Sequence, residues 1–274
     1  MTAPAVEADA TPAPQRVAGV ASIAIHGLLT VPRTATVLGT SGYAVWLAVD
    51  ESVVVVSTRD ATRLPNGIEI AARAIDEPFQ QVHHGAHINV GFGRVMLEGL
   101  AVSVARWWDP RPVLPSINAA DLAGAIDGLA TAVPDVESEQ LAEALRSRSP
   151  NALLAAARPL LGKGPGLTPE GDDFLAGAVA ATRVLSNALG NDAATRMLDA
   201  AANPLADLAE VRTTTFSAAL IQYALRGQVA APAGSLLRAF AGRGDVAPAH
   251  RVLTQVGHSS GPALAAGIVL GAQS

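Results

Sequence analysis

The stretch from Gly162 to Gly177 reads GKGPGLTPEGDDFLAG. Four of its glycines come before the predicted helix, at positions 162, 164, 166 and 171. Glycine lacks Cβ and so allows the backbone to approach a ligand closely or to adopt positive φ. Thr168 followed by Pro169 is typical of a helix N-terminus, with Thr as the cap and Pro at the first helical position. The apolar, Ala-rich segment from Phe174 to Leu189 then predicts a buried helix of about four turns. A glycine loop that opens onto a helix N-terminus is a geometry that binds anions.

The same stretch concentrates charged residues. Lys163 is the only lysine among the 19 basic residues of the chain, and it lies between two glycines. Its position either follows from a composition that favours arginine or provides a point charge for a phosphate or carboxylate. Asp172 and Asp173 form an acidic first helical turn, where they either complement the helix dipole, accept hydrogen bonds from a substrate amide, or hold a divalent cation. Consecutive helical residues point about 100° apart, so only one of the two aspartates can face a cleft squarely.

The loop differs from both common nucleotide-binding loops. In a Walker A motif the lysine is followed by serine or threonine, whereas Lys163 is followed by Gly-Pro-Gly. A dinucleotide fingerprint follows a strand, whereas residues 152–161 read as a helix. We therefore do not expect a nucleotide ligand.

Composition and charge exclude several classes of protein. The chain has 274 residues, a net charge of -5 and a pI near 5.6, and thus no basic surface for nucleic acid. It has no cysteine, which excludes disulfides, thiolate metal sites and a catalytic thiol. No uninterrupted apolar run reaches membrane-spanning length. We therefore expect a cytoplasmic protein that binds neither nucleic acid nor a membrane.

Three segments differ in their predicted structure. Residues 1–16 contain prolines and acidic residues without an apolar core, and we expect a disordered tail. Residues 17–112 are rich in valine, isoleucine and aromatics between turns, which predicts an antiparallel β-rich sheet or a small barrel. Residues 113–274 alternate Ala-rich segments with Gly or Pro breaks, which predicts an all-helical region that carries the glycine-rich loops. The predicted fold class is α+β, with the polar loops lining a groove between the two parts.

Within these segments the patterns predict individual elements. Asn118 is expected to cap the first helix, with Asp121 three residues later. Pro204 is expected to separate two helices, at 193–202 and 204–211. Strands are predicted at 20–29, 43–49, 53–57, 87–98 and 100–105.

The glycine-rich stretch has an echo near the end of the chain. GLTPEGDDFLAG at 166–177 and GHSSGPALAAG at 257–267 both lead from a polar glycine loop into a helix of small residues. In both, the last two glycines are six residues apart. Two such loops either bring two helix N-termini to one site from opposite sides or simply repeat a common type of helix start. His258 lies in the second loop, where it can donate to an anion or act as an acid.

A third polar cluster, formed by residues 212–215 and Ser217, interrupts the helical region. It forms either a corner between two helices or one wall of a ligand site.

We assign Asp172, Asp173 and His258 as candidate catalytic residues. HHGAH at 83–87 lacks a carboxylate pattern for a metal and is interpreted as structural, so no metal site is predicted. The candidate substrate-binding residues are Lys163, Gly164, Gly166, Thr168, Gly171, Arg212, Thr213, Thr214, Ser217, Ser259, Ser260 and Gly261.

These motifs resemble a known family. GKGPGLTPEGDDFLAG is similar to the GPGLTPSGDD signature of a family long catalogued as a domain of unknown function, to which the AllH-type subunit of oxamate carbamoyltransferase belongs. Less specific similarities are Trp-Asp-Pro at 108–110, TTTFSAALIQYALRG at 213–227 and GHSSGPALAAGIVLG at 257–271. The family commonly has Asp two residues after the glycine that matches Gly261, where this chain has Ala263.

The resemblance implies a subunit of a multi-subunit carbamoyltransferase, which converts oxalurate and phosphate into oxamate and carbamoyl phosphate in allantoin (purine) breakdown. It implies partner subunits and a small anionic substrate, namely oxamate, carbamoyl phosphate or phosphate. Carbamoyl transfer needs no covalent nucleophile, only positioned reactants and donors aimed at the developing charge. The alternative is a non-catalytic subunit that binds a small carboxylate or acts as a scaffold for a partner.

Overall fold

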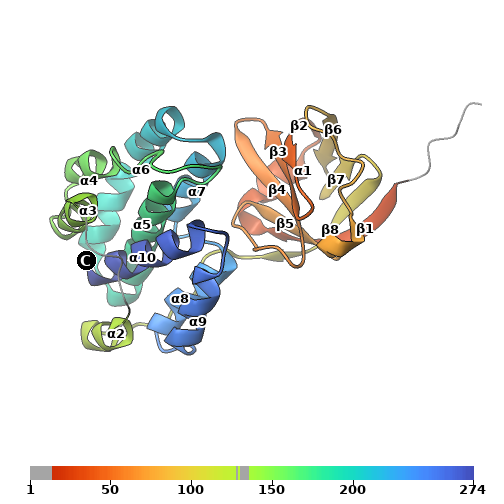
Figure 1. The fold of residues 1–274 in the computed structure, drawn as a ribbon. Helices are drawn as coiled ribbons and strands as arrows, with labels where there is room; N and C mark the ends of the chain where they lie inside the picture. Colours follow the sequence, from red (N-terminus) through yellow and green to blue (C-terminus); the bar gives the residue numbers. More distant parts are fainter. Residues whose placement is uncertain (1–13, 128, 130–135) are drawn as a thin grey trace, which may run out of the picture.

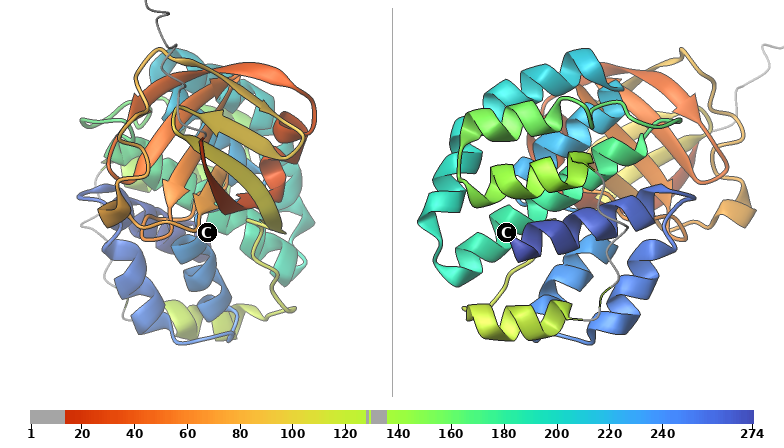
Figure 2. Two further views of the ribbon diagram at one scale, coloured as in Figure 1. Left: turned by 90° about the vertical axis from the view of Figure 1, so that its right-hand side faces the viewer. Right: turned by 60° about the vertical axis from the view of Figure 1, so that its left-hand side comes forward.

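The computed structural model describes residues 14–127, 129 and 136–274. Figures 1 and 2 show a β-barrel packed beside a helical region, with the end of the chain on the far side of the helices. The α+β prediction, with a sheet or barrel followed by helices, is confirmed. No helix in the described part of the chain combines the length and the apolar character needed to cross a membrane.

Eight strands close the barrel in the order β1-β5-β4-β3-β2-β6-β7-β8. The sheet is mixed rather than antiparallel throughout, because β1 pairs with β8 and β4 with β5 in parallel. Parallel neighbours need a crossover connection, which the segment between β4 and β5 supplies. The strands are β1 (Gln15–Ser22), β2 (Arg33–Thr40), β3 (Ala44–Val49), β4 (Ser52–Thr58), β5 (Gly67–Ile70), β6 (His87–Gly91), β7 (Arg94–Leu97) and β8 (Leu100–Trp108).

The start of the barrel corrects two sequence expectations. Gln15 and Arg16, assigned to the tail, lie in β1, and residues 1–13 of that predicted tail lie outside the described residues. The strand predicted at 20–29 ends at Ser22, whose hydroxyl accepts from the Ala24 N–H. A short 3₁₀ helix (Ile23–Ile25) and α1 (His26–Thr30) follow. This turn of helix places Ile25 and Leu29 in the barrel core, a burial that the apolar run alone could not distinguish from a strand.

The helical region contains nine helices among the residues that the structure covers. Asn118 caps the first of them by accepting from Asp121 N–H at 2.8 Å, as predicted. Pro204 does not separate two helices, because α6 continues through it. The helices are α2 (Ala119–Ile126), α3 (Val136–Arg146), α4 (Pro150–Ala157), α5 (Glu170–Leu189), α6 (Asp192–Arg212), α7 (Thr215–Leu225), α8 (Ala231–Phe240), α9 (Val246–Thr254) and α10 (Ser260–Gln273).

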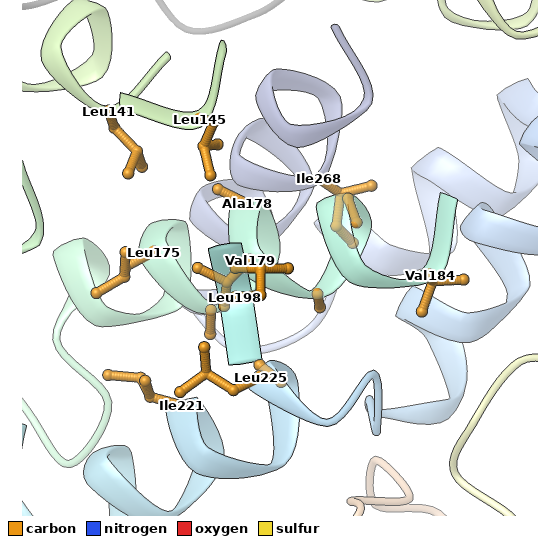
Figure 3. Close-up of a cluster of buried hydrophobic side chains, with 14 of the residues drawn as sticks. Leu141, Leu145, Leu175, Ala178, Val179, Val184, Leu198, Ile221, Leu225 and Ile268 are labelled. Atoms are coloured by element: carbon orange, nitrogen blue, oxygen red, sulfur yellow. The ribbon is translucent and has the colours of Figure 1, made fainter. Parts of the chain in front are cut away.

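Helix α5 forms the centre of the helical core, as its apolar sequence predicted. Leu175 and Val179 of α5 are fully buried in the hydrophobic cluster of the helical region, part of which Figure 3 shows. The neighbours contribute Leu141 from α3, Leu198 from α6, Ile221 from α7 and Ile268 from α10. Because this core fixes the position of α5, it also fixes the glycine-rich loop that leads into the helix.

Helices α5 and α10 pack closely at glycines from the two echoed motifs. A Cβ on Gly177 would lie closer than 3.0 Å to the Leu264 carbonyl, and one on Gly267 would lie equally close to the Phe174 carbonyl. These two contacts are reciprocal, since Phe174 and Leu264 each lie three residues after the first helical glycine of their motif. Gly271 likewise approaches Ala178, four residues further along both helices, so the helices run parallel. Both N-termini therefore lie at the same end of the pair, and not on opposite sides of a site as the echo suggested.

Candidate active site

A cleft of about 1180 Å³ separates the barrel from the helices. Its helical wall includes Thr168 from the glycine loop, Asp173 from the first turn of α5 and Ser260 from the start of α10. Its barrel wall includes Trp46 from β3 and Arg63 from the segment after β4. A concave site between two structural units, with few polar groups in a mostly apolar wall, is the usual position of a small-molecule site.

The two glycine loops meet at the floor of this cleft. Thr168 Oγ1 and Ser260 Oγ lie 2.9 Å apart in a hydrogen bond, so the loops that the echo paired are in direct contact. Thr168 is not the cap of α5, because Pro169 occupies that position and no side chain caps the helix. The Thr-Pro pattern favours a cap locally, but here the hydroxyl is directed to a partner 92 positions away.

Asp172 stabilises the loop and does not line the cleft. Its side chain is 1% exposed. Oδ1 accepts from the Gly162 N–H at 2.8 Å, and Oδ2 accepts a very short hydrogen bond from the Thr213 hydroxyl. A buried carboxylate with two such donors is well satisfied. Asp172 thus joins the start of the loop to the corner between α6 and α7.

Asp173 is the acidic group on the cleft floor. It is 7% exposed, and its Oδ2 has no hydrogen-bond partner among the described residues. Burial raises the pKa of Asp173 to about 7; the hydroxyls of Ser260 and Thr168 oppose this rise, and the charge of Asp172 adds to it. A carboxyl group whose pKa lies near neutrality can both donate and accept a proton under physiological conditions.

Three backbone N–H groups of the glycine loop, those of Gly162, Lys163 and Gly171, donate to acceptors within the protein. Lys163 N–H donates to the Leu160 carbonyl at 3.0 Å, and Gly171 N–H donates to the Lys163 carbonyl at 2.9 Å. Gly164 and Gly166 adopt φ of +113° and +95°, conformations that glycine allows. The glycines therefore shape the loop, and the N–H groups of residues 163 and 171 point to carbonyls of the protein and not to a ligand.

Lys163 forms an ion pair outside the cleft. Its Nζ lies 3.3 Å from Glu137 Oε1 of α3, and both side chains are partly exposed. The ammonium is thus directed to a helix that the motif does not include. The pair connects the glycine loop to α3.

The polar corner at 212–217 supports the loop from the other side. Thr214 caps α7 by accepting from the Ser217 N–H at 3.0 Å, and its hydroxyl donates to the Leu167 carbonyl at 2.6 Å. Ser217 is buried, whereas Arg212 is exposed at the end of α6. None of the residues 212–215 and 217 lines the cleft, which is instead reached from α7 by Phe216.

The second glycine loop contributes Gly257 and Ser260 to the cleft lining. His258 is exposed and does not line the cleft. Ser259 precedes α10 without forming a side-chain cap. Gly261 is packed so tightly against the Leu253 carbonyl that a Cβ would lie closer than 3.0 Å to it. The second loop thus places one hydroxyl, that of Ser260, at the floor beside Asp173.

The barrel wall supplies groups that the motifs did not indicate. Val45, Leu47 and Val49 of β3 face the barrel core, so Trp46 faces outward, where its ring meets Phe216 edge-on at 6.4 Å. The Trp46 Nε1 is buried without a partner, as is Gln228 Oε1 in the segment between α7 and α8. Strand periodicity could have identified Trp46 as an outward aromatic, but only the fold places it against the helices.

Arg63 is the basic residue of the cleft wall, and it is already paired. Its Nε and Nη2 donate to the two carboxylate oxygens of Glu69 at 3.1 and 2.5 Å. The guanidinium also lies over the ring of Trp108, with its carbon 5.6 Å from the ring centroid. Within the described residues, no group of three or more His, Cys, Asp or Glu side chains could hold a metal ion.

The comparison with known proteins bears on the helical region. No curated protein and no solved structure matches the chain significantly. Residues 160–272 match the sequence model of a family described as "Oxamate carbamoyltransferase subunit AllH". The matched residues include both glycine loops, Asp173 and the polar corner, and they exclude the barrel. The resemblance to the AllH family is therefore confirmed for the motifs at 162–177, 213–227 and 257–271, whereas Trp-Asp-Pro at 108–110 lies outside the matched residues.

Proposed function

We propose that this chain is a subunit of a carbamoyltransferase and binds a small amide-bearing substrate, oxamate or oxalurate, on the cleft floor. The observation that carries the proposal is Asp173, which is buried, has an unpaired oxygen and lies where the two loops of the family-matched region meet. Amide N–H and carbonyl groups are suitable partners for a carboxyl group flanked by hydroxyls. The reaction would belong to allantoin breakdown in the cytoplasm.

Asp173 would act as the proton donor and acceptor of the transfer. When a phosphate oxygen attacks the carbamoyl carbon of oxalurate, the bond between that carbon and the oxamate nitrogen breaks. Protonated Asp173 gives its proton to the departing nitrogen, so oxamate leaves as a neutral amide and Asp173 becomes a carboxylate. In the reverse direction the carboxylate takes the amide proton. A pKa of about 7 populates both forms near neutral pH.

The other predicted site residues would act mainly on the loops. Thr168 and Ser260 are hydrogen-bonded to each other beside Asp173, where their hydroxyl oxygens would orient a substrate. Asp172 and the 212–217 corner would hold the glycine loop in place, as their contacts with it suggest. A preorganised site needs such a supporting layer, because small displacements of the reacting groups cost rate.

Replacement of Asp173 tests the proposal. In the enzyme assembled with its partner subunits, Asp173→Asn should lower kcat for phosphate-dependent oxalurate cleavage about 10²- to 10⁴-fold, with a smaller change in KM. It should also remove the limb of the pH profile that reports this group. Glu170→Gln is the matched control, since Glu170 lies in the same helical turn but is exposed. Activity of the Asp173 variant within threefold of wild type would refute the catalytic role.

One observation favours the alternative of a non-catalytic binding or scaffolding subunit. Arg63 is the only Lys or Arg that lines the cleft within the described residues, and it is paired with Glu69. If the subunit is non-catalytic, the Asp173 variant should show the same transfer rate as wild type. Substitutions on the surface of the subunit should instead reduce assembly of the complex. Assembly is measured by mass photometry, and transfer is measured on the same samples.

A further inference from the structure

The cleft lacks an available cation. All Lys and Arg residues of the chain fall within the residues that the structure describes, because residues 1–13, 128 and 130–135 contain none. Only Arg63 among them lines the cleft, and both oxygens of Glu69 occupy its guanidinium. Lys163 is paired with Glu137, and Arg212 does not line the cleft. The described lining therefore holds more acid than base.

The helix N-termini do not compensate for this deficit. At α5, the N–H groups of Asp172 and Asp173 both donate to the Pro169 carbonyl. The first turn of α5 is also acidic, which disfavours a nearby anion. At α10, the Gly261 N–H donates to the Val256 carbonyl, and Pro262 has no N–H. Phosphate carries at least one full charge and is bound by charge-assisted hydrogen bonds in proteins, whereas the one basic side chain of the described lining, Arg63, is already paired, so the proposed reaction calls for a cation from outside this lining.

The mouth of the cleft has the character of an interface. Tyr43 from the barrel side and Val252 from α9 both line the cleft, yet they are 57% and 55% exposed. They belong to opposite walls of the cleft. Large exposed side chains such as these at the rim of a cleft are typical contacts for another protein surface.

We infer that a partner subunit of the same enzyme covers the mouth of this cleft, contacts Tyr43 and Val252, and extends an Arg or Lys side chain toward Asp173, where that side chain binds the phosphate. This inference rests on the proposed function, because that function is the reason why phosphate must bind. The choice of occupant follows from charge, since an acidic cleft with no uncommitted cation is complemented by a basic segment. The active site would then be shared between two subunits.

The test compares the isolated chain with the complex formed by co-expression with its partner subunits. Calorimetric titration with inorganic phosphate should give binding to the complex and at least 100-fold weaker binding to the isolated chain. Val252→Glu should weaken assembly at least tenfold in mass photometry. Phe92→Asp is the control, because Phe92 is exposed in the turn between β6 and β7 and adopts positive φ, which Asp tolerates.

Two results would overturn the inference. One is phosphate binding to the isolated chain within threefold of the complex; the other is a Val252→Glu variant that assembles as well as Phe92→Asp. Circular dichroism of both variants, and the milder Val252→Ser, distinguish lost contacts from lost folding. If Val252→Glu blocks assembly but the wild-type complex cleaves no oxalurate, the interface stands and the proposed function fails. If the complex is active and Val252→Glu changes nothing, the proposed function stands and this inference fails.

Discussion

Asp173 should make the stability of the protein depend on pH in a way that its asparagine variant does not. Its pKa is about 7 in the folded chain, against an ordinary value of 3.8. As the pH rises, the side chain of residue 173 therefore ionises in the unfolded chain at a lower pH than in the folded chain. Stability from this group is fully present below pH 3.8, falls through the intermediate range and is lost above pH 7. The complete loss amounts to about 4 kcal/mol, because the shift is about three units at 1.36 kcal/mol each.

Urea denaturation at pH 5.5 and pH 8, followed by the helical circular dichroism signal, measures this effect. Between these two pH values the linkage relation gives a loss of about 2 kcal/mol for wild type from this group alone. Asn has nearly the same shape as Asp but does not titrate. The free energy of unfolding of Asp173→Asn, measured relative to wild type, should therefore rise by about 2 kcal/mol between pH 5.5 and pH 8. Other titrating groups cancel in this difference. Glu170→Gln should show no such shift, and an Asp173→Asn variant whose pH dependence parallels wild type would refute the assignment of a neutral, buried Asp173.

The remaining predictions concern the supports of the site. Asp172→Asn should cost about 1.5 to 3 kcal/mol in urea denaturation at pH 7, because it weakens two charge-assisted hydrogen bonds; no loss would contradict its supporting role. Gly177→Ala should destabilise by about 1 to 3 kcal/mol through a clash between α5 and α10, whereas Gly124→Ala, with open space around it in α2, should be neutral or stabilising by up to about 1 kcal/mol in the same assay. Lys163→Met should change stability by less than about 1 kcal/mol and leave phosphate and oxamate affinity unchanged in calorimetry at two salt concentrations, because the lysine pairs with Glu137. A tenfold to hundredfold loss of affinity would restore Lys163 as an anion ligand.

The β-rich half could be predicted as a sheet or barrel because its strands are local runs of β-branched residues. Closure and strand direction could not be predicted, because the parallel pairs β1 with β8 and β4 with β5 depend on which distant edges meet. The apolar run at 20–29 was misassigned because Ile25 and Leu29 are buried in a helical turn instead of a strand. A local run of apolar residues therefore predicts that the side chains are buried more reliably than it predicts whether the backbone is a strand or a helix.

The contact between the two loops of the candidate site could be predicted from the glycine echo, but the other residues that line the cleft could be predicted only in part. The echo brought together the loops that hold Thr168 and Ser260, which are in contact. The cap assigned to Thr168 was wrong because a tertiary hydrogen bond replaced the local one. Trp46 and Arg63 could not be predicted, since no motif marks them and only the packing of the barrel on the helices brings them to the cleft.

The reciprocal glycine contacts relate α5 to α10 by a constant shift in sequence, and this shift gives Ala263 a structural meaning. The pairs Gly171 with Gly261, Phe174 with Leu264 and Gly177 with Gly267 each occupy equivalent positions in the parallel helices. By the same shift, Ala263 is the counterpart of Asp173. The sequence resemblance places an Asp at this position in the family, so a chain of the usual pattern would carry one such acid on each helix. This chain carries it on α5 alone, and Ala263 does not line the cleft. Proton transfer in the proposed reaction would therefore depend on the single carboxyl group of Asp173, because no second acid at the equivalent turn of α10 can share the proton.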